Sequence, residues 1–256
     1  MKSLFLSISL GSLFFACEGK KQTTNTATTA PAAAQATTAA IQDSKTYFVL
    51  TSWTTSDRAK AMEHVPNQQK QLMSLWNKGL VENIYYNQNA KFKDGEPLPL
   101  IAFFANGANE FDVRTMLDST DIVIHNLATY TLREVGRKIF LRSRNAANLT
   151  AGTAIESYAV VWTLTGDRSK MDTTSFTAQA IMTARLQDVG ILENIYVDLS
   201  PLGTKASAIN PAVFIINSKD KAGAKKVLDE MPIVKSKKAT YGLYDVGQYF
   251  MGTKDE

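Results

Sequence analysis

Two glutamates in nearly identical surroundings are the residues of this sequence best placed to do chemistry. Glu82 lies in the segment GLVENIY, residues 79–85, and Glu193 lies in GILENIY, residues 190–196. Both segments are typical of a β-strand. Burial raises the pKa of a carboxyl group, which suits a general acid or base. The pattern is consistent with proton transfer beside a carbonyl group, and equally with carboxylates that are solvated or ion-paired near a strand end.

Other polar residues recur with these glutamates or follow the expected first strands. The set that could bind a ligand is Asn83, Tyr85, Tyr130, Arg58, Asn194, Tyr196, Tyr241 and Arg168. An arginine in a loop at a strand end could clamp a carboxylate, and amides or hydroxyls could orient another polar group. The alternative is structural, because repeated tyrosines in strands mostly serve packing. An Asp-Arg pair after a strand can equally begin a helix.

Histidine chemistry has little support in the sequence pattern. His64 is a third catalytic candidate, as an acid or a base. Neither His64 nor His125 recurs in the repeat described next, and no triad pattern surrounds them. Two isolated histidines and one cysteine give no metal-ligand spacing, and the sequence contains no glycine-rich phosphate loop. We therefore predict no metal and no cofactor.

The segments around the glutamates belong to an internal repeat. Their offset is 111 residues (190 minus 79), and the same offset carries Phe103 onto Phe214 and the Val-Gly pair 135–136 onto 246–247. A gapless match of this length indicates two copies of one domain. The predicted parts are repeat 1 at 45–136, a connector at 137–156 and repeat 2 at 157–256.

Local patterns predict the elements of each copy. β-branched and aromatic runs predict strands, and apolar residues at helical spacing predict helices. Pro66 is expected to bar one helix from running through 57–66, and Gly79 is typical of a helix C-cap. The predicted strands are 46–53, 80–86, 100–105 and 127–135, then 158–164, 191–197, 212–216 and 239–246. The predicted helices are 67–78 and one after the caps at 106–109, then one ending near 189 and one at 220–229.

This order, βαββαβ in each copy, defines the predicted fold class. It is the ferredoxin-like unit, a four-stranded antiparallel sheet with helices on one face. In the strand around Glu82, simple alternation places Val81, Asn83 and Tyr85 on one face, and Leu80, Glu82 and Ile84 on the other. Both faces carry large apolar residues, so the second face needs a cover as well. We therefore predict an α+β protein whose two ferredoxin-like repeats pack sheet to sheet as an intramolecular α/β barrel.

The N-terminus is typical of an export signal. Lys2 is followed by an apolar run that ends at Cys17, the only cysteine. The run is too short to span a bilayer, and its end resembles the bacterial lipobox. We predict a signal peptide at 1–16 and a lipidated Cys17 that begins a flexible Thr/Ala-rich tether at 17–44. The expected location is the cell envelope, with the outer membrane favoured over the inner. The alternative is a secreted protein with a spare thiol.

The repeats resemble a known group of proteins. The helix–glycine–strand junctions at 79–85 and 190–196, and the close of the second repeat at 228–232 before 240–241, are similar to the dimeric α/β-barrel superfamily. Within that superfamily, they resemble the muconolactone-isomerase-like and YciI-like branch. The resemblance implies a small-molecule cleft between sheet and helices. It does not fix a reaction.

Three functions follow as hypotheses from these patterns. The first is an envelope lipoprotein that binds a small, partly apolar molecule in its repeat clefts. The second is an isomerase or lyase that uses a strand carboxylate as general base, and the third is a structural or protein-interaction module. The net charge of +4 is too small and too scattered to predict nucleic-acid binding. The expected partners are the membrane, through Cys17, and a small ligand, and the sequence leaves self-association open.

Overall fold

The structure is a computed structural model that describes residues 44–88, 90, 99–165, 173–198 and 212–252. Its strands are β1 (Lys45–Trp53), β2 (Val81–Asn87), β3 (Leu100–Gly107), β4 (Ala128–Val135), β5 (Arg137–Phe140), β6 (Glu156–Leu164), β7 (Leu192–Val197), β8 (Ala212–Ser218) and β9 (Ala239–Met251). Its helices are α2 (Arg58–Asn77), α3 (Glu110–Asp118), α4 (Asp121–Ile124), α5 (Arg144–Thr150), α6 (Thr173–Asp188), α7 (Lys221–Asp229) and α8 (Pro232–Lys235). None of the helices in these residues is long and apolar enough to cross a membrane.

One antiparallel sheet runs through both halves of the described chain. Its nine strands follow the order β4-β1-β3-β2-β9-β6-β8-β7-β5. The long strand β9 joins the halves, because its first part pairs with β6 and its last residues pair with β2. The short strand β5, which follows β4 in the chain, pairs with β7 of the other half. The predicted fold class, two tandem repeats with separate sheets packed as a barrel, is therefore wrong.

The strands pass from one half to the other at two glycines. Gly247 of β9 has φ +79°, and a Cβ built on it would lie 2.4 Å from the Cα of Asn87 in β2. Gly136, between β4 and β5, approaches β7 more closely, since its Cβ would lie 2.1 Å from the carbonyl oxygen of Val197. Only a residue without a side chain fits at such a close crossing of backbones. The 111-residue offset superimposes Gly136 on Gly247.

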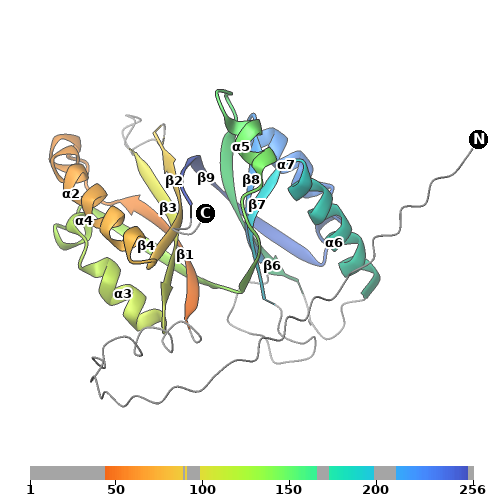
Figure 1. Ribbon diagram of the computed structural model, residues 1–256, viewed down its shortest axis with the longest axis horizontal. Coiled ribbons are helices and arrows are strands. Elements are labelled where there is room, and N and C mark those ends of the chain that lie inside the picture. The colour runs from red at the N-terminus through yellow and green to blue at the C-terminus, as the bar shows by residue number, and fades with distance from the viewer. Residues whose placement is uncertain (1–43, 89, 91–98, 166–172, 199–211, 253–256) are drawn as a thin grey trace, which may run out of the picture. The chain divides into compact units, whose positions relative to one another are not determined.

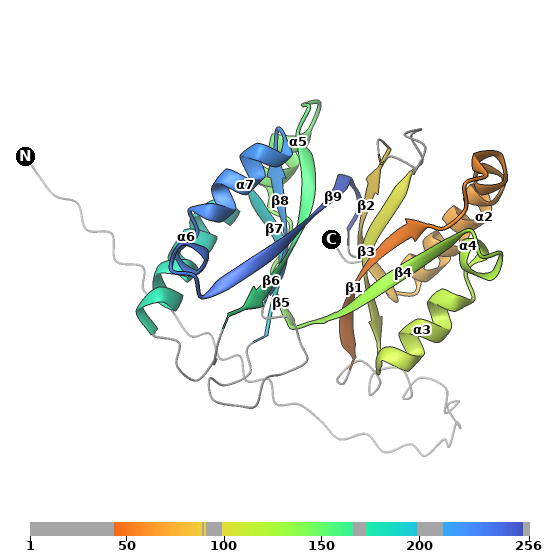
Figure 2. The ribbon, with the colours of Figure 1, turned by 180° about the vertical axis from the view of Figure 1, so that it is seen from behind.

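Helices cover the outer faces of the sheet, and apolar side chains fill the space between its halves. Figures 1 and 2 show α2, α3 and α4 over β1–β4, and α5, α6 and α7 over β6–β8. A cluster from both halves lies between the inner faces, and it comprises Phe48, Tyr85, Ala102, Phe104, Val135, Ala159, Val161, Tyr196, Val213, Ile215 and Val246. Two further clusters fill the sheet–helix layers, one in each half. The halves therefore share one interior.

Helix α2 is longer than predicted. It runs without a break from Arg58 to Asn77, with Pro66 inside it. Asp57 caps its start by accepting a hydrogen bond from the Lys60 amide at 3.0 Å. Gly79 follows its end with φ +70°, as the sequence predicts for a C-cap glycine. The predicted break at Pro66 is wrong, because a proline removes one hydrogen bond and bends a helix without always ending it.

The two strands that carry the predicted glutamates are bulged at their asparagines. Asn83 and Asn194 both have φ +48°, and the pairing registers of β2 and β7 shift on either side of them. A bulge inserts one unpaired residue and reverses the alternation beyond it. Tyr85 therefore points to the interior between the halves, with Glu82, whereas Ile84 and Val81 pack toward the helices. The faces predicted by simple alternation are wrong for this reason.

Candidate functional site

The predicted residues of the second repeat form a buried polar network with Tyr85 of the first. The Tyr85 hydroxyl donates to Oε1 of Glu193 at 2.9 Å and accepts from the amide of Asn194 at 2.7 Å. Nε of Arg142 lies 2.8 Å from the other Glu193 oxygen, and its guanidinium stacks 4.1 Å from the ring centroid of Tyr249. Glu193 is fully buried. Burial raises the pKa of its carboxyl group, although Arg142 and Tyr85 oppose that shift.

The first repeat supplies a matching network. The Tyr196 hydroxyl donates to Oε1 of Glu82 at 2.5 Å and accepts from the amide of Asn83 at 3.1 Å. Lys138 takes the place of Arg142, with its ammonium 3.9 Å from the second Glu82 oxygen. Each copy of the repeated ENIY motif thus binds the tyrosine of the other copy. The duplication that the sequence shows is used as a reciprocal clamp between the halves.

The oxygens of both glutamates are already bound within the protein. Each glutamate binds a tyrosine and lies beside a basic side chain, and neither lines any of the three grooves found beside α2 and α6. A general base needs a free oxygen within reach of the proton that it removes. The hypothesis of an isomerase or lyase that uses Glu82 or Glu193 is therefore wrong, and the two carboxylates act in holding the halves together.

The other predicted ligand-binding residues are spread over the surface. Tyr130 donates to Asp118 at the end of α3 at 2.5 Å, and Tyr241 donates to Asp229 at the end of α7 at 2.6 Å. Burial and Asp118 raise the pKa of Tyr130 to about 12. Arg168 lies outside the described residues, and Arg58 is the first residue of α2 and is exposed. Tyr130, Tyr241 and Arg58 do not converge on one site.

Three residues that the sequence did not connect, His64, Asp121 and His125, lie together in the structure. The chain has two histidines, His64 and His125, and both reach Asp121. Nδ1 of His64 lies 2.6 Å from Oδ2 of Asp121, and Nδ1 of His125 lies 3.7 Å from Oδ1 and 2.8 Å from the Asp121 carbonyl oxygen. The ring centroids are 4.3 Å apart. The ligand atoms of the three side chains lie within 4.8 Å of one another.

Two helices bring these residues together. His64 stands in the second turn of α2, Asp121 is the first residue of α4, and His125 is the C-cap of α4. Side-chain oxygens of α2 cap α4 directly, because Gln71 accepts from the Asp121 amide at 2.7 Å and Gln68 from the Ile122 amide at 3.5 Å. The sequence offered no signal for this cluster, since α4 is a single turn and the histidines are far apart in the chain.

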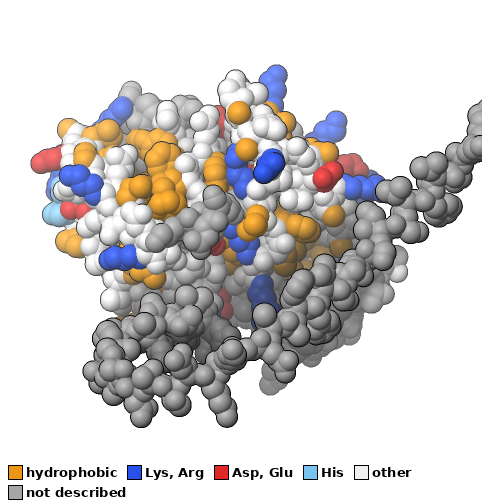
Figure 3. All heavy atoms as spheres, viewed as in Figure 1, with side chains coloured by type: hydrophobic (Ala, Val, Ile, Leu, Met, Phe, Trp, Pro, Cys, Tyr) orange, Lys and Arg blue, Asp and Glu red, His pale blue; other side chains and the backbone are white. Residues whose placement is uncertain are grey.

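The cluster is partly open to solvent. The exposed fraction of the side chain is 17% for His64, 16% for Asp121 and 46% for His125. In the space-filling view, histidine atoms reach the surface at the edge where α2 and α4 lie (Figure 3). An ion from solution would therefore have access to this site.

The second half has the same helix pair without the cluster. Gln179 of α6 accepts from the Ile233 amide of α8 at 3.3 Å, as Gln68 does for α4. At the 111-residue offset, the counterparts of His64, Asp121 and His125 are Ser175, Pro232 and Ser236. Packing of α2 on α4 therefore does not by itself require two histidines and an aspartate.

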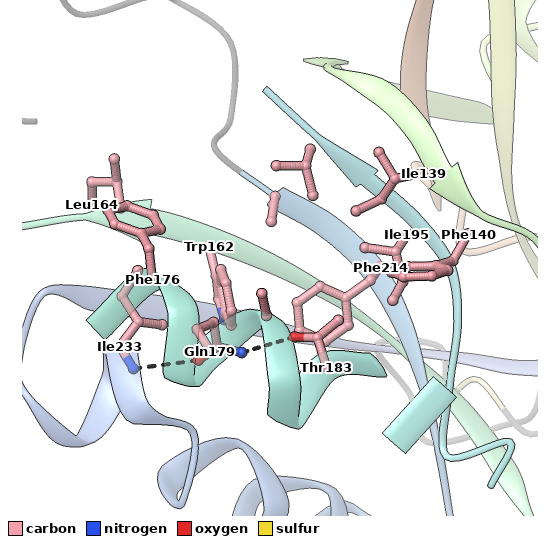
Figure 4. Close-up of a pocket in the computed structure, with 13 residues that line it drawn as sticks. Ile139, Phe140, Trp162, Leu164, Phe176, Gln179, Thr183, Ile195, Phe214 and Ile233 are labelled. Carbon is pink, nitrogen blue, oxygen red and sulfur yellow. Dashed lines mark hydrogen bonds between the residues drawn. The ribbon is translucent and has the colours of Figure 1, made fainter. Parts of the chain in front are cut away.

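Apolar grooves lie between the long helix and the sheet in each half. The groove beside α6 has a volume of about 340 Å³, and Figure 4 shows Trp162, Phe176 and Phe214 around it, with Gln179 at its polar end. The groove beside α2 has a volume of about 260 Å³ and is lined by residues that include Leu72 and Phe250. None of the three residues of the His–Asp–His cluster lines either of these two grooves.

Comparisons with known proteins find structural likeness only. No family model and no curated protein matches the chain. Two mutants of chlorite dismutase from Candidatus Nitrospira defluvii are 9% and 12% identical, with TM-scores of 0.48 and 0.47. The matches cover 79% and 81% of this chain and 92% and 91% of theirs. A haem-binding protein from Thermus thermophilus is 13% identical with a TM-score of 0.45, over 80% of this chain and 92% of the other. At this similarity, the comparisons give the chain neither a family nor an activity.

Two predictions fail at this point. The resemblance to the muconolactone-isomerase-like and YciI-like branch is wrong, because no family model and no curated protein matches the chain. The predicted binding of a small molecule by a tandem barrel is wrong as well, because the two halves share one continuous sheet and do not form that barrel. The signal peptide, Cys17 and the tether lie outside the described residues.

Proposed function

We propose that this protein binds a divalent transition-metal ion, of the kind that zinc represents, through His64, Asp121 and His125. One observation carries the proposal. The only two histidines of the chain, 61 residues apart (125 minus 64), meet at the two sides of one carboxylate. Neither histidine has a counterpart in the repeat, so the repeat itself does not account for their meeting.

The donor set suits such an ion. Two imidazole nitrogens and a carboxylate oxygen are common zinc ligands, at 2.0–2.2 Å from the ion. Ligands around a tetrahedral ion then stand roughly 3.3 Å apart, so atoms that already lie within 4.8 Å need only small side-chain movements. Imidazole favours Zn²⁺, Cu²⁺ or Ni²⁺ over Mg²⁺ and Ca²⁺, which prefer oxygen ligands. Water would complete the coordination on the exposed side.

The competing interpretation is a simple His–Asp contact that holds α2 on α4. The matching helices α6 and α8 are held without any such contact, with serines and a proline at the three positions. A hydrogen bond would also need only one histidine, whereas both face the same carboxylate here. These facts favour metal binding.

Haem is the other ligand to test against the structure, because one similar structure is named as a haem-binding protein. Among the described residues, the groove beside α6 is lined by no histidine, cysteine, methionine or tyrosine, the side chains that hold haem iron. The smaller groove beside α2 is lined by Met73 and Tyr86 but, in the same part of the chain, by no histidine or cysteine. Neither of these described linings offers a histidine or cysteine to haem iron, and we do not propose haem.

Calorimetric titration of the full-length protein with Zn²⁺ tests the proposal. We expect one ion per chain, with Mg²⁺ and Ca²⁺ unable to compete. His64→Gln, His125→Gln and Asp121→Asn should each weaken binding by more than about 10-fold, the smallest loss seen for residues that merely support a ligand. Glu63→Gln removes an exposed carboxylate next to His64 and is the matched control, expected to bind as the wild type does.

The only thiol of the chain needs its own control. Cys17 could bind zinc independently, so the titration is repeated with Cys17→Ser, which should leave the site unchanged. Absence of saturable binding would contradict the proposal. So would binding that survives the double substitution of His64 and His125 by glutamine.

Envelope location and a membrane anchor at Cys17 are a separate proposal, supported only by residues 1–17. Incorporation of a labelled fatty acid into the wild-type protein, and its loss in Cys17→Ser, is the expected result. Equal labelling of both proteins would refute the anchor.

A further inference from the structure

We propose that the metal ion acts as a conformational clamp on the first two turns of α2, residues 58–65. In the absence of the ion this segment opens locally, and the ion closes it by joining His64 to α4. The inference rests on the proposed metal binding and adds what that binding does to the protein.

The segment is separated from the rest of α2 by Pro66. Proline has no amide hydrogen, so the carbonyl of Met62 lacks its helical partner, and the ring crowds the same turn. The first turn carries the positive charge of Arg58, which opposes the helix dipole, and the N-cap Asp57 offsets that charge. The hydrogen bond that is missing at Pro66 therefore makes the first two turns weak as a helix.

Few contacts hold this segment to the body of the protein. Ala61 is its only buried residue. Beyond Pro66, by contrast, Leu72, Leu75 and Trp76 of α2 belong to the core cluster under the helix. The corresponding part of α6 carries Phe176, which packs on its own core, where α2 has the smaller Val65. Apolar burial thus anchors the end of α2 but hardly its beginning.

His64 provides the polar link between this segment and α4. Its Nδ1 lies 2.6 Å from Asp121, whereas the capping residues Gln68 and Gln71 belong to the part of α2 after Pro66. An opening of 58–65 carries His64 away and leaves Asp121 and His125 in place on α4. The open state therefore keeps two of the three ligands and binds the ion more weakly.

This geometry makes a quantitative prediction for hydrogen exchange. An ion that binds the closed state much more tightly than the open state reduces the population of the open state by about the factor 1 + [L]/Kd, as long as the free ion concentration stays below the dissociation constant of the open state. Exchange of amides that are freed by this opening, at 61–65, should slow about 100-fold when free Zn²⁺ is 100 times Kd, and tenfold more for each further tenfold rise.

Hydrogen exchange of the full-length protein, measured by mass spectrometry over a zinc titration, is the test. We expect strong protection within 61–65 and little change in α6, which is the matched control inside the same chain. His125→Gln should lose the zinc-dependent protection. Pro66→Ala, which restores the missing amide, should slow exchange at 62–65 at least about 10-fold without any metal.

The outcomes distinguish the proposed closing of residues 58–65 from metal binding itself. Equal protection of α2 and α6 would show general stabilisation and overturn the clamp. Calorimetric binding without a change at 61–65 would also overturn it while leaving the proposed function intact. If calorimetry shows no binding, both proposals fail together.

Discussion

Replacement of Gly247 by alanine should test how the two halves are joined. Gly247 is the point at which β9 leaves β6 and begins to pair with β2. The added methyl group would lie 2.4 Å from the Cα of Asn87 and 2.4 Å from the carbonyl oxygen of Tyr86. Both atoms belong to the backbone, so no side-chain rotation relieves the contact. The end of β9 must move away from β2.

Two costs add up at this position. A side chain at φ +79° costs about 1–2 kcal/mol, because the left-handed region places Cβ against the following carbonyl group. The collision adds about 1–3 kcal/mol, the range for extra atoms forced into a packed interior. Together these costs should lower the free energy of unfolding by about 2–5 kcal/mol.

Gly79→Ala is the matched control for this change. Gly79 has φ +70°, but no atom lies within 4 Å of the position of its Cβ. It therefore reports the conformational cost alone, about 1–2 kcal/mol. Urea unfolding, followed by circular dichroism and by the fluorescence of the three tryptophans, gives both free energies. Equal losses for the two variants would refute the close crossing of β9 and β2.

Two further predictions concern the tyrosine–glutamate contacts between the halves. Tyr85→Phe should lower the free energy of unfolding by about 1–3 kcal/mol, because Glu193 and Asn194 each lose a buried partner, and denaturant titration measures it. The pKa of Glu193 is raised in the folded protein, so its protonation favours folding. The wild type should therefore gain stability relative to Glu193→Gln as pH falls from 7 to 4.5. An unchanged difference between the two proteins would contradict this prediction.

Local patterns in the sequence located many elements correctly and failed where the chain interacts with itself at long range. The strand predicted at 46–53 is confirmed as β1, and the helix predicted at 220–229 as α7. The faces of β2 were assigned wrongly, because the bulge at Asn83 interrupts the alternation on which the prediction relied. The segment expected to be a connector contains β5, whose residues stand at the 111-residue offset from the last four of β9.

The candidate site was missed for the same reason. His64 and His125 were judged one at a time, and neither has a neighbour in the sequence that suggests a ligand set. Asp121 carries no sequence signal for metal binding, because an aspartate in the first turn of a helix is common without any ligand. Only the packing of α2 on α4 places the three side chains together.

The sequence by itself determined that one unit is written twice, where most of the strands and the main helices lie, and which residues recur. Periodicity and glycine or proline positions report these features because they depend on neighbours along the chain. Only the tertiary structure decided that β9 and β5 extend into the other half, that each glutamate binds the other copy's tyrosine, and that two histidines share Asp121. Such contacts join residues far apart in the chain, and their formation depends on the packing of the whole interior.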